Sequence, residues 1–176
     1  ALINTEGELN LTGGKFTQSG NGATYAIICQ GAAVATISGA EISGIHGVIA
    51  ANDNANVTIT SGMYELLGVA GQSDHCVYAA ENATVMITGG SFIGEHDAGG
   101  KTLYVDGTNA SIVVFGGIFD EPVAEELCGK AYAPVENADG TFGVEHRYVA
   151  AIGETYYETF AAAYTASKPG DTITIF

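Results

Sequence analysis

The sequence predicts an all-β fold, a right-handed parallel β-helix of about five coils with a small α/β cap at its C-terminal end. Two repeated patterns predict it. The first is a short apolar strand followed by a small-residue turn and one large apolar residue, and it occurs at residues 9–16, 35–42, 57–64, 85–92 and 112–119. A repeat of roughly 20–30 residues built from short strands is typical of β-solenoids.

The second pattern is another short strand in most repeats, at residues 26–29, 47–50, 76–79 and 102–105. A repeat with two or three very short strands is smaller than a propeller blade, which is a four-stranded sheet. It favours a chain that coils in one direction, with parallel strands stacked from coil to coil. Because parallel crossovers are right-handed in nearly all proteins, we expect a right-handed coil.

The core follows from the period of two in side-chain direction along a strand. Apolar residues alternate with Thr, Ser and Asn, so the apolar set is expected to face inward. The three predicted core columns are Leu9, Ala35, Val57, Val85 and Ile112; Leu11, Ile37, Ile59, Ile87 and Val114; and Phe16, Ile42, Tyr64, Phe92 and Phe119. At three polar corners, Asn54, Asn82 and Asn109 are expected to stack along the solenoid axis.

Three regions are expected along the chain: β-helix repeats over 1–119, a capping helix and hairpin over 120–147, and a hairpin–helix–strand module over 148–176. The residues 122–128 suit a short helix, with acids in its first turn. The hairpin after it would cover the end of the solenoid, whose unpaired strand edges otherwise invite aggregation. Thr159 is expected to cap the helix of the last module.

Charge and composition exclude several classes of partner. Five basic residues face twenty acidic ones, for a net charge of −15. Nucleic acid is excluded because phosphate binding needs a basic stripe, and an anionic polysaccharide would meet the same repulsion. Three widely spaced cysteines predict small buried thiols rather than a disulfide or metal framework. No apolar run approaches the length of a membrane span. Because the chain begins within a repeat-like phrase, we expect a fragment of a longer protein.

The C-terminal third resembles a known bacterial module. The resemblance lies in residues 119–144 and in 148–176, above all in the Lys-Pro-Gly-Asp-Thr-Ile-Thr-Ile element over 168–175. The module recurs in large surface proteins of gram-positive, often gut-dwelling bacteria, where it follows a pectate-lyase-like right-handed β-helix and the last element usually opens another helix. The resemblance implies an extracellular or cell-surface location, with carbohydrate, host proteins or cell-surface proteins as partners.

One group of polar residues falls in the loops before the second strand of each repeat. Counting back two residues from equivalent strand positions places His46, His75 and Lys101 on adjacent coils, with Tyr25 one coil earlier and Asp74 in the same loops. Such a group can supply a general acid–base pair or cation ligands. The alternative is a solvated polar loop face. We expect no cofactor, with calcium as the one alternative.

A second candidate group is aromatic. Tyr78 and Tyr104 occupy equivalent positions in adjacent coils. If they face outward they form a stacked aromatic surface suited to sugar rings, and if inward they belong to the core. Together with Tyr25, they and the loop residues His96 and Asp97 are the candidate binding residues.

These observations predict a non-catalytic extracellular surface module, a spacer or adhesin that contacts glycans. The alternative is a carbohydrate-active β-helix enzyme, a polysaccharide lyase or glycoside hydrolase. By resemblance to β-helix lyases, which hold calcium with carboxylates and abstract a proton with a basic residue, His46, His75, Lys101 and Asp74 would then be catalytic. His75→Ala would separate the two hypotheses.

Overall fold

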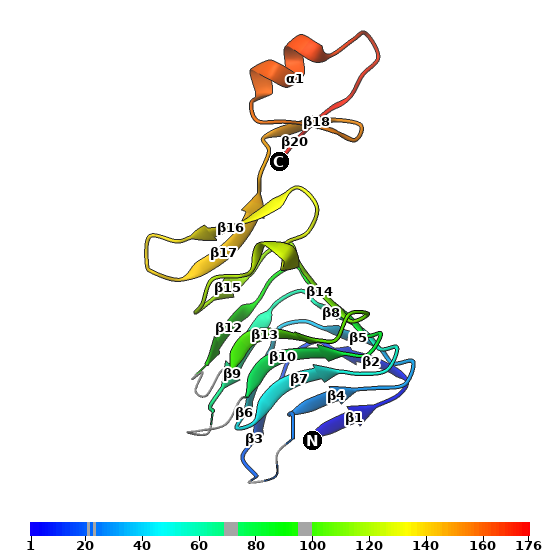
Figure 1. Cartoon of the computed structure of the whole chain (residues 1–176), viewed down its shortest axis with the longest axis vertical. Helices are drawn as coiled ribbons and strands as arrows, with labels where there is room; N and C mark the ends of the chain where they lie inside the picture. The colour runs from blue at the N-terminus through cyan, green and yellow to red at the C-terminus, as the bar shows by residue number, and fades with distance from the viewer. Residues whose placement is uncertain (21, 23, 69–73, 95–99) are drawn as a thin grey trace.

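A computed structural model describes residues 1–20, 22, 24–68, 74–94 and 100–176. The fold is all-β, and its main body is a parallel β-solenoid of about four turns. Figure 1 shows the strands stacked from the N-terminus at one end toward the C-terminal residues at the other. Among the described residues, no helix is both long and apolar enough to cross a membrane.

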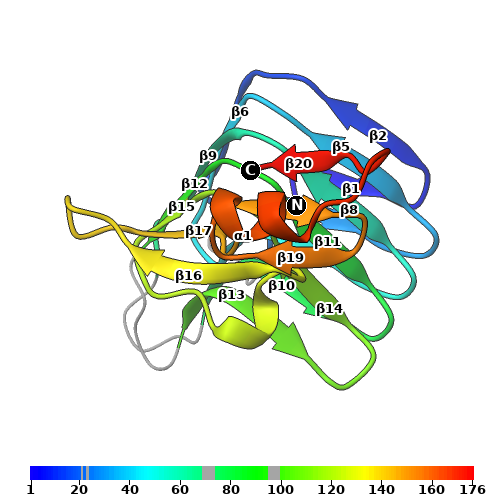
Figure 2. The same cartoon turned by 90° about the horizontal axis from the view of Figure 1, so that it is seen from above.

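Three sheets form the sides of the solenoid, and each turn contributes one strand to each sheet (Figure 2). Sheet A contains β1 (Ile3–Thr5), β4 (Ile27–Cys29), β7 (Gly47–Ala51), β10 (His75–Ala80) and β13 (Lys101–Asp106). Sheet B contains β2 (Glu8–Leu11), β5 (Val34–Ile37), β8 (Asn56–Ile59), β11 (Thr84–Ile87) and β14 (Ser111–Val114). Sheet C begins with β3 (Lys15–Gln18), β6 (Ala40–Gly44), β9 (Gly62–Leu66), β12 (Ser91–Gly94) and β15 (Ile118–Phe119).

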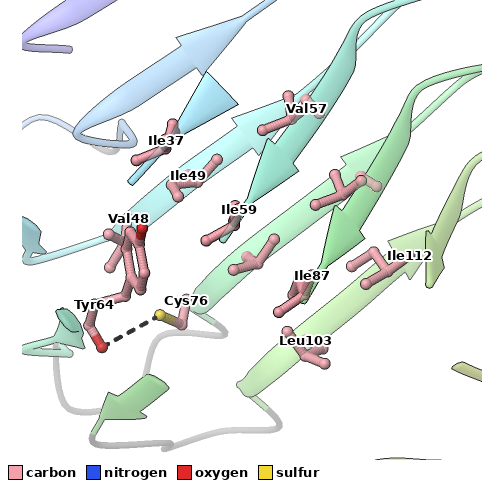
Figure 3. Packing of buried hydrophobic residues seen from close by; sticks show 14 of the residues in the cluster. Ile37, Val48, Ile49, Val57, Ile59, Tyr64, Cys76, Ile87, Leu103 and Ile112 are labelled. Atoms are coloured by element: carbon pink, nitrogen blue, oxygen red, sulfur yellow. Dashed lines mark hydrogen bonds between the residues drawn. The ribbon is translucent and has the colours of Figure 1, made fainter. Parts of the chain in front are cut away.

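The three predicted core columns are confirmed by the strand register. Their side chains point into the solenoid (Figure 3). Tyr64, Phe92 and Phe119 are fully buried and stack along the axis, with ring centroids 4.7 and 5.1 Å apart. In the first turn, Leu9 and Phe16 are only partly buried because β2 and β3 are the end strands of their stacks.

The corners between strands are held by side chains from the next turn. Asn82 Nδ2 donates to Asn54 Oδ1 at 3.3 Å, which confirms the expected stacking for this pair. At the corner between sheets B and C, Gly62 has a φ of +127°, and a Cβ there would collide with the carbonyl oxygen of Ala40. The glycines of the repeated turn therefore serve a tight corner with close approach between turns.

The hairpin of β16 (Tyr132–Glu136) and β17 (Phe142–His146) caps sheet C, as the sequence predicts. β17 pairs antiparallel with β15 and so covers the last edge of that sheet. The helix expected over 122–128 is only a single 3-10 turn, η1 (Glu125–Leu127). Val123 before it is buried against the end of the core, and the backbone is extended at Ala124 and Cys128, so only one turn fits between them.

The last module contains β18 (Ala150–Ile152), β19 (Thr155–Tyr157), α1 (Phe160–Ala166) and β20 (Ile173–Ile175). β18 pairs antiparallel with both other strands. The Thr159 hydroxyl accepts a hydrogen bond from the Ala162 N–H at 3.2 Å, so the predicted helix cap is confirmed. Figure 1 shows this module beyond the capping hairpin, at the far end of the molecule.

Candidate functional site

The outer face of sheet A carries a row of aromatic rings because the alternation of side chains breaks once in each of its last three strands. At this break two consecutive side chains both face the interior of the solenoid. The pairs are Val48 and Ile49 in β7, Cys76 and Val77 in β10, and Thr102 and Leu103 in β13. In β10, the residues on either side of the pair, His75 and Tyr78, therefore both lie on the outer side of the strand, where the ring of Tyr104 covers His75.

The rings of this row contact one another across turns. Tyr78 and Tyr104 are opposite each other in register, with ring centroids 6.1 Å apart and planes 17° apart. His75 stacks on Tyr104 at 4.1 Å with planes 5° apart, and Tyr25 contacts Tyr78 at 5.7 Å. Tyr25, Tyr78 and Tyr104 are half-buried and lie outside the core. The sequence left open whether Tyr78 and Tyr104 face outward or inward, and the structure shows that they face outward.

The stacking changes what the row offers to a ligand. Rings that lie face to face along the axis present mainly edges and hydroxyl groups to solvent, so the row is not a flat platform for sugars. Tyr104 differs because it belongs to β13, the last strand of sheet A. Its ring also lines a groove at the end of the solenoid. The aromatic contact for a ligand is therefore at this end of the row.

This groove is an open depression of about 380 Å³ between the edges of β13 and β14 and the η1 turn. Leu103, Ile112 and Leu127 contribute apolar surface, and Lys101 and Glu126 contribute charged groups. The full lining is Lys101, Leu103, Tyr104, Val105, Ala110, Ser111, Ile112, Ala124, Glu126 and Leu127. An apolar depression with a few polar groups is the usual form of a small-molecule site.

The residue that fixes the aromatic row, Asp106, is absent from the sequence prediction. The Tyr78 hydroxyl donates to Asp106 Oδ2 at 2.7 Å. Partial burial and this hydrogen bond raise the pKa of Tyr78 to about 12, and burial likewise raises the pKa of Tyr25. Asp106 lies two residues beyond Tyr104, which is opposite Tyr78. A search of the sequence for diagonal contacts between neighbouring parallel strands could therefore have found it.

The polar group predicted from the loops is brought together only in part. His75 is opposite Lys101, as predicted, and the Lys101 N–H donates to His75 Nδ1 at 3.1 Å. His75 is opposite Gly47, however, so the equal register expected for His46 is wrong by one residue. The count assumed that Val77 lies opposite Val48, whereas Val77 lies opposite Ile49. The residue that does lie opposite His75 is a glycine, and a Cβ there would collide with the ring of Tyr25.

His46 nevertheless contacts its neighbour on the next turn. Its Nδ1 lies 3.4 Å from Asp74 Oδ1, and the two side chains are only 13% and 11% exposed. His75 is 6% exposed. An imidazole next to a carboxylate can exchange a proton, but groups this buried have little access to a polymer substrate.

Two predicted binding residues, His96 and Asp97, lie outside the described residues. Within the described part of the chain, no group of three or more His, Cys, Asp and Glu side chains is arranged to hold a metal ion. Cys29 and Cys76 are buried free thiols, as the sequence predicts, whereas the free thiol of Cys128 is only partly buried because it lies beside η1 at the surface. The Cys76 thiol donates to the carbonyl oxygen of Tyr64 at 3.8 Å, so it belongs to the core (Figure 3).

Comparison of the chain with known protein families, curated proteins and solved structures finds no match.

Proposed function

We propose that this chain is a non-catalytic module of an extracellular bacterial surface protein, a rigid spacer that binds a neutral glycan in the groove beside Tyr104. The observation that carries the proposal is the position of this ring, which ends the aromatic row and lines the groove. The resemblance of residues 119–176 to modules of gram-positive surface proteins supports the location.

The chemistry of the groove fits a sugar. The apolar face of a pyranose stacks on a tyrosine ring, as aromatic and aliphatic surfaces do elsewhere. Lys101 and Glu126 supply a donor and an acceptor for hydroxyl groups at the same time. A neutral ligand is favoured because the chain carries a net charge of −15, which repels polyanions.

The row beneath Tyr104 preorganises it. Its ring is held by His75 and Tyr78, and the Tyr78 hydroxyl is fixed in turn by Asp106. A side chain that is already ordered loses little conformational entropy on binding. The stacked row therefore serves the glycan site by supporting its last ring.

A glycan array with neutral and charged sugars tests this function, followed by titration of the best neutral ligand. Tyr104→Ala is expected to weaken binding about tenfold, since loss of an aromatic stacking contact removes about 1 kcal/mol or more. Tyr164→Ala is the matched control because Tyr164 is 67% exposed in α1. Unchanged binding by the folded Tyr104→Ala variant, or binding of no neutral glycan, would contradict the proposal.

A carbohydrate-active enzyme is the second candidate, and the His46–Asp74 contact near His75 and Lys101 favours it. Turnover of a panel of neutral and acidic polysaccharides separates the two functions. An enzyme of this kind would release oligosaccharides and lose the activity in His75→Ala. A binding module shows affinity without product, and that result is the one we expect.

A further inference from the structure

A second cleft lies where the capping hairpin meets the last module, away from sheet A. Its volume is about 290 Å³. It is lined by Glu125 of η1, the segment 128–131 between η1 and β16, Tyr132 of β16, Arg147 and Tyr148 after β17, and Tyr156 of β19. Figure 1 shows that one segment of the chain, between β17 and β18, connects the hairpin to the last module.

Aromatic rings form a fixed wall of this cleft. Tyr148 and Tyr156 stack with centroids 5.2 Å apart and planes 23° apart. Behind them, His146 packs edge-on against Tyr132 at 4.9 Å and stacks on Phe176 at 3.6 Å. The wall therefore combines rings from the hairpin and from the last module, and because Tyr148 and Tyr156 lie face to face it presents ring edges and hydroxyl groups that can bond with a sugar.

The cleft also gathers two of the five basic residues in the chain, Lys130 and Arg147. Arg147 Nη2 donates to Glu125 Oε1 at 2.7 Å, and the guanidinium has further N–H donors besides this pair. Lys130 is exposed and has no ion pair among the described residues. Among the residues that line the cleft there are thus two cations and one carboxylate.

The backbone between the two cations is strained. Ala131 has a φ of +71°, a left-handed conformation that costs free energy for a residue with a Cβ and no polar side chain. Two backbone hydrogen bonds hold it, from Tyr132 N–H to Gly129 O at 2.9 Å and from Arg147 N–H to Ala131 O at 2.7 Å. The second bond fixes Arg147 beside the turn that carries Lys130.

We propose that this cleft binds a terminal acidic sugar that carries one carboxylate. The carboxylate pairs with Arg147 and Lys130, and the sugar hydroxyl groups bond with the hydroxyl groups of Tyr148 and Tyr156. A single charge gains from the local cations, whereas the net charge of −15 repels a polyanion at each of its many charges. The site is separate from the groove beside Tyr104, so either proposal stands without the other.

Calorimetric titration of the full chain with methyl galacturonide, methyl galactoside and polygalacturonate tests the assignment. The two monosaccharides differ only in the carboxylate. The galacturonide is expected to bind at least about tenfold more tightly than the galactoside, because its carboxylate forms charge-assisted hydrogen bonds that the galactoside cannot form. Polygalacturonate is expected to bind more weakly per residue than the monosaccharide. Equal affinity for the two monosaccharides, or tighter binding of the polymer, would overturn the proposal.

Variants locate the site. Lys130→Gln and Arg147→Gln are each expected to weaken galacturonide binding about tenfold, while Lys168→Gln, which removes an exposed charge from the last module, leaves it unchanged. Lys130 lacks an ion pair, so its variant stays informative even if loss of the Arg147–Glu125 pair loosens the cap. Tyr104→Ala should not affect this ligand. Equal losses in Lys130→Gln and Lys168→Gln would refute the site.

Discussion

The solenoid and the module over 148–176 are stabilised in opposite ways. Within the solenoid, each core residue packs against the same position in the turns before and after it, as the stack of Tyr64, Phe92 and Phe119 shows. The last module buries only small apolar side chains, Ala150, Ala151 and Ala163. Five of its large apolar groups are exposed and the others are only half-buried; the exposed ones are Val149, Phe160, Tyr164, Ile175 and Phe176.

This difference indicates where stability comes from in a repeat protein. Neighbouring turns contribute interface free energies that add along the stack. The last module has no comparable core, so its order depends on the rings that join it to the cap, above all the stack of His146 on Phe176. The solenoid therefore acts as the rigid part, and small changes in packing at the junction would alter the cleft that Lys130 and Arg147 line.

The strongest test of the comparison is a pair of Phe→Ala variants. Phe92→Ala removes a fully buried ring from the middle of the stack and leaves a cavity, so it is expected to lower the free energy of unfolding by about 3–5 kcal/mol. Phe160→Ala, in which the lost ring is 46% exposed, is expected to change it by about 0.5 kcal/mol or less. Chemical denaturation measures both. Similar losses in the two variants would contradict the assignment of stability to the solenoid.

The last turn of the solenoid gives the next test. Asp120 follows the short β15 and completes the end turn with its side chain: Gly94 N–H donates to its Oδ2 at 2.6 Å, and Thr102 Oγ1 donates to its Oδ1 at 2.8 Å. Thr102 is buried, so Asp120→Ala leaves a buried hydroxyl without this acceptor. We expect a loss of about 1–3 kcal/mol by denaturation. Glu145→Ala, which removes an exposed carboxylate from β17, is the control. Equal effects would show that the end turn is closed without Asp120.

The repeats could be predicted from the sequence because one rule, alternation with a period of two, governs sheets B and C throughout. Sheet A departs from this rule at the paired buried residues Cys76 and Val77, and no sequence pattern marks that break. The departure explains why the direction of Tyr78 stayed open and why the register of His46 was wrong. A count from Val48 assumes that Val77 lies opposite it, whereas Val77 lies opposite Ile49.

The two clefts were beyond sequence reasoning for a different reason. The groove beside Tyr104 forms between the solenoid and η1, and the second cleft forms between the cap and the last module. Neither η1 nor the last module is a repeat, so no periodicity in the sequence relates the residues that line these clefts. Tyr104 was identified from its repeat position, but its partners in the groove, Glu126 and Leu127, come from the η1 turn. Lys130 and Arg147 line the same cleft because the hairpin brings the residue after β17 back beside the residues before β16.

The smallest expected effect concerns the aromatic row, where the pKa of Tyr78 is raised from its ordinary value of 10.0 to about 12, first by burial and then by the hydrogen bond to Asp106. Because the folded pKa is higher than the unfolded one, the contribution of Tyr78 to stability is complete below pH 10 and is lost as the pH rises through about 12. Tyr25 and Tyr64 titrate in the same direction. Ultraviolet difference absorbance of tyrosinate, compared between the wild type and Tyr78→Phe, isolates the step due to Tyr78.

Asp106→Asn is expected to lower that pKa, since the substitution removes the negative charge and keeps an amide oxygen as acceptor at the same place. The row should stay folded in this variant, because the ring contacts of Tyr78 with Tyr104 and His75 do not depend on the charge. If Tyr78 titrates at the same pH with and without Asp106, burial alone sets its pKa. The hydrogen bond would then contribute nothing to holding the row that supports Tyr104, and the preorganisation of the glycan site would rest on ring stacking only.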